Sequence, residues 1–117
     1  MRKKLHKRRQ AGFTLIEIMI VMLIMTILIS IAIPNWMRAR ETSRTQSCVT
    51  NLREIESAKE QFAAETRRTV GDAVDMANVV PDYIRQNPEC PSGGGYVAEP
   101  IGTNPSCPNA DLGHTLN

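Results

Sequence analysis

The chain has 117 residues, a length typical of one small domain, and 42% of them are hydrophobic. Its formal net charge of +2 averages two unlike parts, because six of the 14 basic residues lie within residues 1–12 and all 12 acidic residues come later. The part after residue 12 is therefore acidic, which excludes direct binding of nucleic acid by a basic folded face.

Residues 1–12 read as a basic leader that ends in Gly12. Lysine and arginine beside a membrane span hold that end of a chain in the cytoplasm. We therefore expect a single pass through the inner (cytoplasmic) membrane, with the N-terminus in the cytoplasm and everything after Ile33 outside it.

Residues 13–33 form an apolar run of 21 residues with one charge, Glu17. As a helix this run would be about 31 Å long, enough to cross a bilayer. A carboxylate at the middle of such a helix costs about 2.5–3.5 kcal/mol and somewhat less near its end. No lysine or arginine lies in the same run, so the partner must come from elsewhere. A cut between Gly12 and Phe13 would create one, the α-amino group of Phe13, on the same chain or on a neighbour.

A helical pattern continues beyond Pro34, which removes one backbone donor and predicts a kink rather than an end. From about residue 35 to about residue 66 the pattern is amphipathic. Its apolar stripe consists of Val49, Leu52, Ile55, Ala58, Phe62 and Ala63. We place Lys59 and the acidic residues between these positions on the solvated face.

The extracytoplasmic head is expected to comprise residues 34–117. Its residues after the amphipathic helix must cover the apolar stripe of that helix. A short helix is expected at about residues 72–85, with Asp72 as its N-cap. Proline, glycine, serine and asparagine then dominate, and short strands at residues 95–98 and 114–116 would give a minimal β-hairpin within residues 90–117.

The chain has three cysteines, and in an extracytoplasmic space they can oxidise. Three single bridges are possible, each leaving one thiol over. A Cys90–Cys107 disulfide would close a short loop rich in turn residues, so we expect this pair. Cys48 sits in the helical pattern and is expected to stay unpaired.

No cofactor, metal site or enzyme activity is expected. Cys90, Cys107 and His114 offer three zinc ligands, but their spacing fits no strong pattern and the compartment favours oxidation. The glycines at 93–95 lack the lysine and the helix that follow them in a phosphate-binding loop, so they predict a turn.

At the junction of leader and apolar run, the residues resemble the N-terminus of type IV pilins and pseudopilins. That family has a short basic leader, a final glycine (here Gly12), then an aromatic residue (Phe13), and glutamate at the fifth mature position (Glu17). Pro34 matches the proline at mature position 22. The resemblance implies cleavage after Gly12 by a prepilin peptidase, N-methylation of Phe13, and neutralisation of a neighbour's N-terminus by Glu17 during assembly.

A weaker resemblance covers the C-terminal stretch from Cys90 to Leu116, which is similar to short pilin-like proteins of bacterial genomes. The major pseudopilin of type II secretion carries a calcium loop near its C-terminus. Here only Asp111 is near, without a second acid, so the usual oxygen cage is missing.

We therefore expect an α+β, pilin-like fold: a long kinked N-terminal helix, half of it transmembrane, and a small disulfide-pinned β-hairpin head. The expected function is that of a structural subunit of a type IV pilus or a type II-secretion-like pseudopilus, first in the membrane and then in a periplasmic or extracellular filament. Its expected partners are other pilin-like subunits, prepilin peptidase and an inner-membrane assembly platform.

Three other interpretations carry less weight. A conventional secretory signal cut near Ala32 would have too long an apolar region, with an acid in it. An uncut membrane anchor leaves the string from Gly12 to Glu17 unexplained. A membrane-tethered extracytoplasmic binding module is the alternative function, and it would need neither cleavage nor Glu17.

Overall fold

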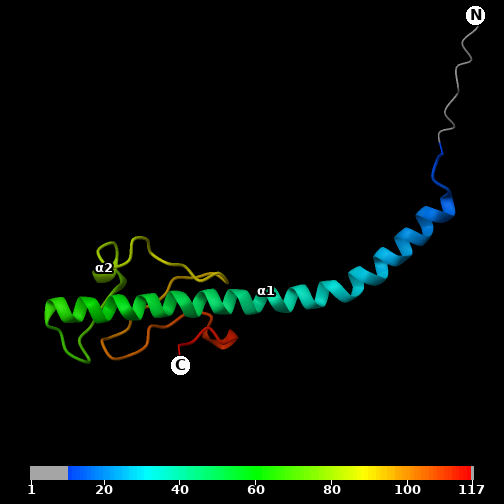
Figure 1. The fold of residues 1–117 in the computed structure, drawn as a ribbon. Coiled ribbons are helices and arrows are strands. Elements are labelled where there is room, and N and C mark those ends of the chain that lie inside the picture. Colours follow the sequence, from blue (N-terminus) through cyan, green and yellow to red (C-terminus); the bar gives the residue numbers. More distant parts are fainter. Residues whose placement is uncertain (1–10, 117) are drawn as a thin grey trace, which may run out of the picture. The chain divides into compact units, whose positions relative to one another are not determined.

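A computed structural model describes residues 11–116 of the chain (Figure 1). Its elements are α1 (Leu15–Thr66), α2 (Met76–Val79) and the 3-10 helix η1 (Ala110–Leu112). The chain divides into two compact units, Met1–Met37 and Arg38–Asn117, which are described separately below as the N-terminal unit and the head.

The long N-terminal helix expected from the sequence is confirmed as α1, which has 52 residues. Pro34 lies inside α1, so the helix does not end there. A proline in a helix interior removes one backbone hydrogen bond and commonly bends the helix without ending it. The expected kink at Pro34 stays a prediction.

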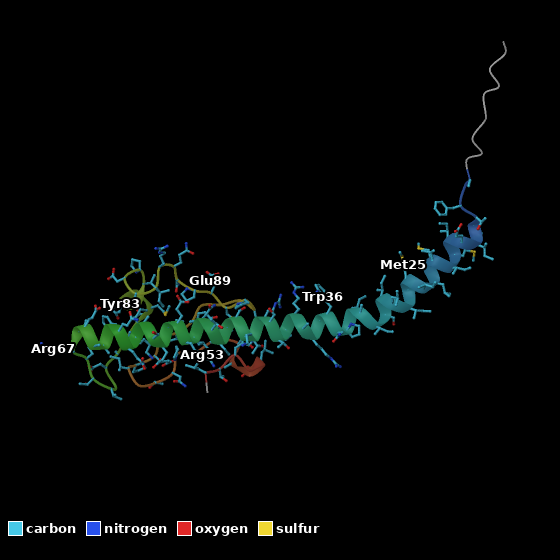
Figure 2. All side chains as sticks on the ribbon, in the orientation of Figure 1. Met25, Trp36, Arg53, Arg67, Tyr83 and Glu89 are labelled. Carbon is cyan, nitrogen blue, oxygen red and sulfur yellow. The ribbon has the colours of Figure 1, made fainter. Side chains whose placement is uncertain are left out.

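Every described side chain of the N-terminal unit is exposed. The apolar side chains of this unit, such as that of Met25, project from α1 and lie exposed along it (Figure 2). Its large hydrophobic residues are 42–83% exposed. An apolar surface of this extent in a single chain indicates burial against lipid or against other protein chains.

The head packs around the C-terminal half of α1, and the later segments of the chain lie along that half (Figure 1). Four residues of the expected stripe are buried there, namely Leu52, Ile55, Ala58 and Phe62. Their partners come from the following segments: Val74, Val79, Ile84, Tyr96 and Ala98. The amphipathic pattern thus predicted which face of α1 the head covers.

Lys59 departs from the expectation, because it is buried rather than solvated and only 1% exposed. Its ammonium group lies 2.9 Å from the Glu56 carboxylate and donates a hydrogen bond to the carbonyl oxygen of Thr103. A buried charge is tolerated only when it is paired and hydrogen-bonded, and both conditions hold here. The hydrogen bond from Lys59 therefore links the loop around Thr103 to α1.

The second helix is shorter than expected and begins later. α2 has only four residues, and its N-cap is Asp75, whose side chain accepts a hydrogen bond from the backbone of Met76 at 2.7 Å. Asp72 instead accepts the backbone N–H of Thr69 at 2.8 Å and so closes a turn. The capping chemistry was read correctly, but it was assigned to the wrong aspartate.

The expected β-hairpin is not formed by the described residues. Pairing is limited to two isolated antiparallel bridges, Glu89 with Gly95 and Val97 with Ser106. Four prolines (Pro91, Pro100, Pro105 and Pro108) and four glycines with positive φ (Gly93, Gly94, Gly102 and Gly113) interrupt this region. Prolines lack the N–H that a ladder needs, and such glycines turn the chain, so neither bridge extends into a strand.

Candidate functional site

The first turn of α1 carries the acidic residue singled out in the sequence. The backbone N–H of Thr14 points to the Glu17 carboxylate at 3.4 Å, and the backbone N–H of Glu17 points to the Thr14 hydroxyl at 3.3 Å. This reciprocal pair is a capping box, with threonine at the N-cap and glutamate three residues later. The string Thr14-Leu15-Ile16-Glu17 therefore also starts the helix, a local role that the sequence analysis missed.

Gly12 and Phe13 lie directly before this cap, and both are exposed. Phe13 is 83% exposed, and a Cβ atom added to Gly12 would meet nothing within 4 Å. Packing within this chain does not require glycine at position 12. Both residues, with Ala11 and Glu17, line a shallow hollow at this end of the unit.

The helix that follows is apolar enough to cross a membrane. Its most apolar 18-residue window has a mean hydropathy of 2.8, and none of that window is buried within the chain. Since the same surface carries the only described acid of the N-terminal unit, Glu17, the carboxylate would sit among apolar groups once this surface is covered. It would then need a cationic partner.

The three cysteines of the head meet in one place, although they lie far apart in the sequence. All three are buried and free, so the expected Cys90–Cys107 disulfide is not confirmed. Cys48 was expected to stand apart, but its sulfur lies 3.5 Å from that of Cys107. The sulfur of Cys90 lies 3.3 Å from Nδ1 of His114, which is fully buried.

The environment of these thiols differs from one to the next. Burial raises the pKa of Cys48 to about 12, although a hydrogen bond with Tyr96 opposes the rise. Burial acts in the same direction on Cys90, but hydrogen bonds from the backbone of Ser92 and from the side chains of His114 and Asn109 lower its pKa to about 6. The cluster therefore includes one thiol for which the surrounding groups favour the thiolate.

The sequence analysis named Cys90, Cys107 and His114 as possible zinc ligands but rejected a site there, and it left Cys48 outside that group. Cys48 was placed in the helical pattern, and spacing alone does not show which later segment packs against it. One signal pointed to more: the string Cys-Pro occurs twice, at Cys90-Pro91 and Cys107-Pro108. Proline after each cysteine favours a similar turn at both positions.

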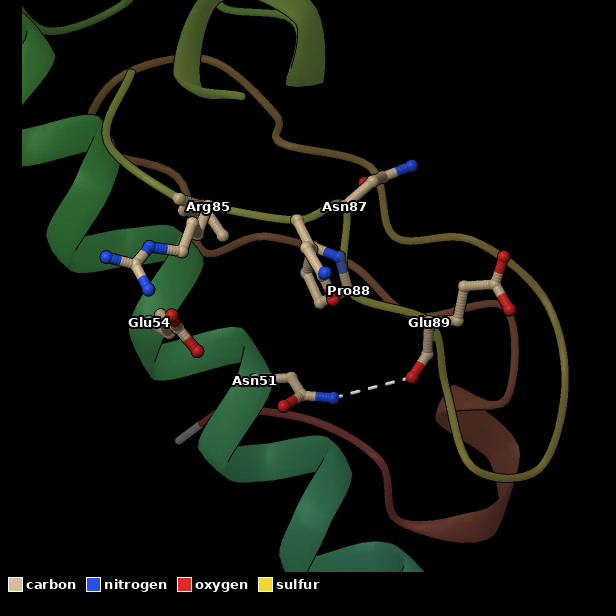
Figure 3. Close-up of a pocket in the computed structure, with 8 residues that line it drawn as sticks. Asn51, Glu54, Arg85, Asn87, Pro88 and Glu89 are labelled. Carbon is tan, nitrogen blue, oxygen red and sulfur yellow. Dashed lines mark hydrogen bonds between the residues drawn. The ribbon is translucent and has the colours of Figure 1, made fainter. Parts of the chain in front are cut away.

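A second feature of the head surface is an open hollow between α1 and the segment after Ile84 (Figure 3). Asn51 of α1 lines this hollow, and its side-chain amide donates a hydrogen bond to the carbonyl oxygen of Glu89 at 3.4 Å. Glu54 and Arg85 line the same hollow. The described lining residues include no nucleophile beside a base, so the geometry does not indicate catalysis.

The N-terminal part of the chain matches a known protein family. Residues 7–33 match the family described as the prokaryotic N-terminal methylation motif. This range contains Gly12, Phe13 and Glu17, so the family match and the residues discussed above coincide.

Several relatives extend the similarity into the head. The type II secretion system core protein G of Aeromonas hydrophila is 30% identical over 106 residues, which cover 79% of this chain and 74% of that protein. The protein of the same name from Klebsiella michiganensis is 31% identical, with 79% and 75% covered. The type IV major pilin protein PilA of Myxococcus xanthus is 41% identical over 68 residues, 58% of this chain and 31% of that protein. No solved structure matches the chain significantly.

Proposed function

This chain belongs to the family of type IV pilins and type II secretion pseudopilins, and we propose that it is cleaved after Gly12 and polymerised through the first turns of α1. Its function is that of a structural subunit of a pilus or pseudopilus, a role shared by the pilin-like relatives. The long apolar helix and the family together indicate a membrane-anchored subunit that is assembled into a filament. The observation that carries the proposal is the uncovered apolar surface of α1 with Glu17 at its start.

Cleavage by a prepilin peptidase is supported by the surroundings of Gly12. The residue is exposed, no neighbour restricts it, and its backbone φ is not positive, so this fold has no need of glycine there. An enzyme that grips the backbone at the cut does need it, because a side chain would hold the two backbones apart. N-methylation would follow on the new amino group of Phe13.

Polymerisation is supported by what the cut does to charge. It removes the basic leader and leaves an ammonium group on Phe13, four residues before Glu17. In a bundle of apolar helices, Glu17 of one subunit and the Phe13 amine of a neighbour cancel each other's desolvation cost. The pair would also fix the register between subunits, since a shifted neighbour would bury both charges unpaired.

The proposed route runs from the inner membrane to the filament. The basic leader stays in the cytoplasm and the head lies outside, as the positive residues at 1–12 suggest. Partners are other pilin-like subunits, the peptidase and an inner-membrane assembly platform. The alternative of a tethered binding module would use the hollow of Figure 3 as its contact surface, without cleavage or polymerisation.

A substitution at the cut site tests this proposal. We expect Gly12→Val to leave the protein at its full length in the membrane fraction and absent from sheared filaments, because valine blocks access to the peptide bond. Immunoblotting of wild type and variant measures the loss of the leader as a mobility difference. Ala11→Val is the matched control, since it adds bulk one residue further from the cut and should be processed normally. Normal processing of Gly12→Val would contradict the proposal and favour the tethered module.

A further inference from the structure

We propose that Cys48, Cys90, Cys107 and His114 form a structural metal site in the head that binds one Zn²⁺ ion. The ligand atoms of these four residues all lie within 4.8 Å of one another, and all four residues are buried. They come from α1, from the two bridged loops and from the segment after η1. This inference concerns the stability of the head and is independent of cleavage and polymerisation.

The spacing of the four atoms suits a tetrahedral zinc centre. Zinc binds cysteine sulfur at about 2.3 Å and histidine nitrogen at about 2.0–2.1 Å, so neighbouring ligand atoms of a tetrahedron lie about 3.5–3.8 Å apart. The Cys48 and Cys107 sulfurs are 3.5 Å apart, and the Cys90 sulfur is 3.3 Å from His114 Nδ1. Small movements of side chains would place all four atoms around one ion. Four protein ligands leave no open position, which is the arrangement of a structural rather than a catalytic zinc.

Two of the cysteines are held by the same kind of turn. In Cys90-Pro91-Ser92-Gly93 the Gly93 N–H donates to the Cys90 carbonyl at 2.8 Å, and in Cys107-Pro108-Asn109-Ala110 the Ala110 N–H donates to the Cys107 carbonyl at 3.2 Å. In each turn the backbone N–H two residues after the cysteine also points at its sulfur, from Ser92 and from Asn109. N–H groups aimed at sulfur stabilise the thiolate, the form that binds a metal.

The side chain of Asn109 joins the two turns. Its Nδ2 donates to the Cys90 sulfur at 3.3 Å and to the Gly93 carbonyl at 2.6 Å, while its own backbone N–H lies 3.4 Å from the Cys107 sulfur. Partners of this kind orient the groups that bind a metal and tune their charge. A single asparagine therefore ties two of the four ligands into one unit.

His114 adds an independent observation. It is fully buried, its Nδ1 lies 3.3 Å from the thiol of Cys90, and its Nε2 has no hydrogen-bond partner among the described residues. Buried polar groups nearly always have a partner, so a histidine left with one weak thiol contact points to a missing one. A metal ion at the centre of the cluster would replace that thiol contact with a strong bond at Nδ1, while Nε2 keeps the ring proton.

A disulfide would involve only two of these four residues. It would join two sulfurs at about 2.05 Å and leave the third thiol and His114 buried together. A metal ion uses all four groups. It would also link α1 to both loops and to the C-terminal segment, in a head whose described residues form only two isolated bridges in place of a sheet. Small domains commonly need such a link.

The direct test uses the full chain, expressed without a prepilin peptidase and purified in detergent under reducing conditions. After removal of metal, we expect it to bind one Co²⁺ per chain, with thiolate-to-cobalt charge-transfer absorption and the visible bands of tetrahedral cobalt. Zinc should displace the cobalt. His114→Ala should weaken binding at least about tenfold. His6→Ala, a change at the other histidine of the chain, should leave binding unchanged.

Two further measurements separate a ligand role from a structural one. His114→Cys should restore cobalt binding with stronger charge-transfer absorption, because a fourth thiolate replaces the imidazole. Protein isolated from the cell envelope without chelators should contain about one zinc per chain and three thiols that react only after chelation. Absence of tetrahedral cobalt bands in the wild type, unchanged binding by His114→Ala, or isolation of a metal-free disulfide form would each overturn the proposal.

Discussion

Replacing Glu17 with glutamine should almost abolish filaments while leaving membrane insertion and cleavage intact. The physical reason is the unpaired ammonium group that each Phe13 would then bury. Removing one member of a buried ion pair costs about 3–5 kcal/mol, and every 1.4 kcal/mol is a factor of ten in an association constant. Addition of each subunit should weaken by roughly two orders of magnitude or more. Immunoblots of sheared filaments, set against the membrane fraction, measure this effect.

Glutamine is the most informative substitution at position 17, because it changes the charge and keeps the local structure. Glu17 also closes the capping box with Thr14, and glutamine serves equally well at that position of the box. The change therefore removes the charge and keeps the start of the helix. Glu60→Gln, at an exposed site of α1 in the head, is the matched control and should assemble normally. Wild-type filament yield from Glu17→Gln would remove the electrostatic mechanism.

Replacing Leu52 with alanine should destabilise the head severely. Leu52 is fully buried at the centre of the face of α1 that the head covers. Such a change costs about 3–5 kcal/mol, through lost burial and the cavity left behind. For a unit of about 80 residues, this is a large part of a total stability of roughly 5–10 kcal/mol. We expect the midpoint of thermal unfolding to fall by more than about 10 °C.

This loss can be measured in the full chain in detergent, at a fixed zinc concentration because bound ligands shift stability. Both tyrosines of the chain, Tyr83 and Tyr96, lie in the head, so their near-ultraviolet circular dichroism follows its unfolding. Leu112→Ala is the matched control, since Leu112 is 57% exposed and the same atoms are lost there at little cost. Equal shifts for the two variants would show that the Leu52 face is not the core.

The features predicted well are those that a short stretch of sequence determines by itself. The apolar run gave the long helix, and periods of three and four gave the buried face around Leu52 and Ile55. The family match at residues 7–33 coincides with the string that the sequence analysis singled out. In each case the physical cause, such as helical periodicity or the cost of a charge among apolar groups, acts within a few residues.

The head was predicted less well because contacts between distant residues shape it. Lys59 looks solvated by position, yet the carbonyl of Thr103, 44 residues later, gives it a buried partner. Cys48 meets Cys107 across 59 residues. The expected strands reduce to single bridges because glycines and prolines bend the chain between them. Neither local propensity nor spacing contains this information.

The most direct test of the central claim is the N-terminal mass of the subunit recovered from sheared filaments. Cleavage and polymerisation through the first turn of α1 require a chain that begins at Phe13 and carries one methyl group on its amine. Peptide mass spectrometry of gel-purified filament protein should find that terminal peptide and no leader. Filaments containing chains that still begin at Met1 would contradict the claim, because Glu17 would then have no Phe13 ammonium group to meet.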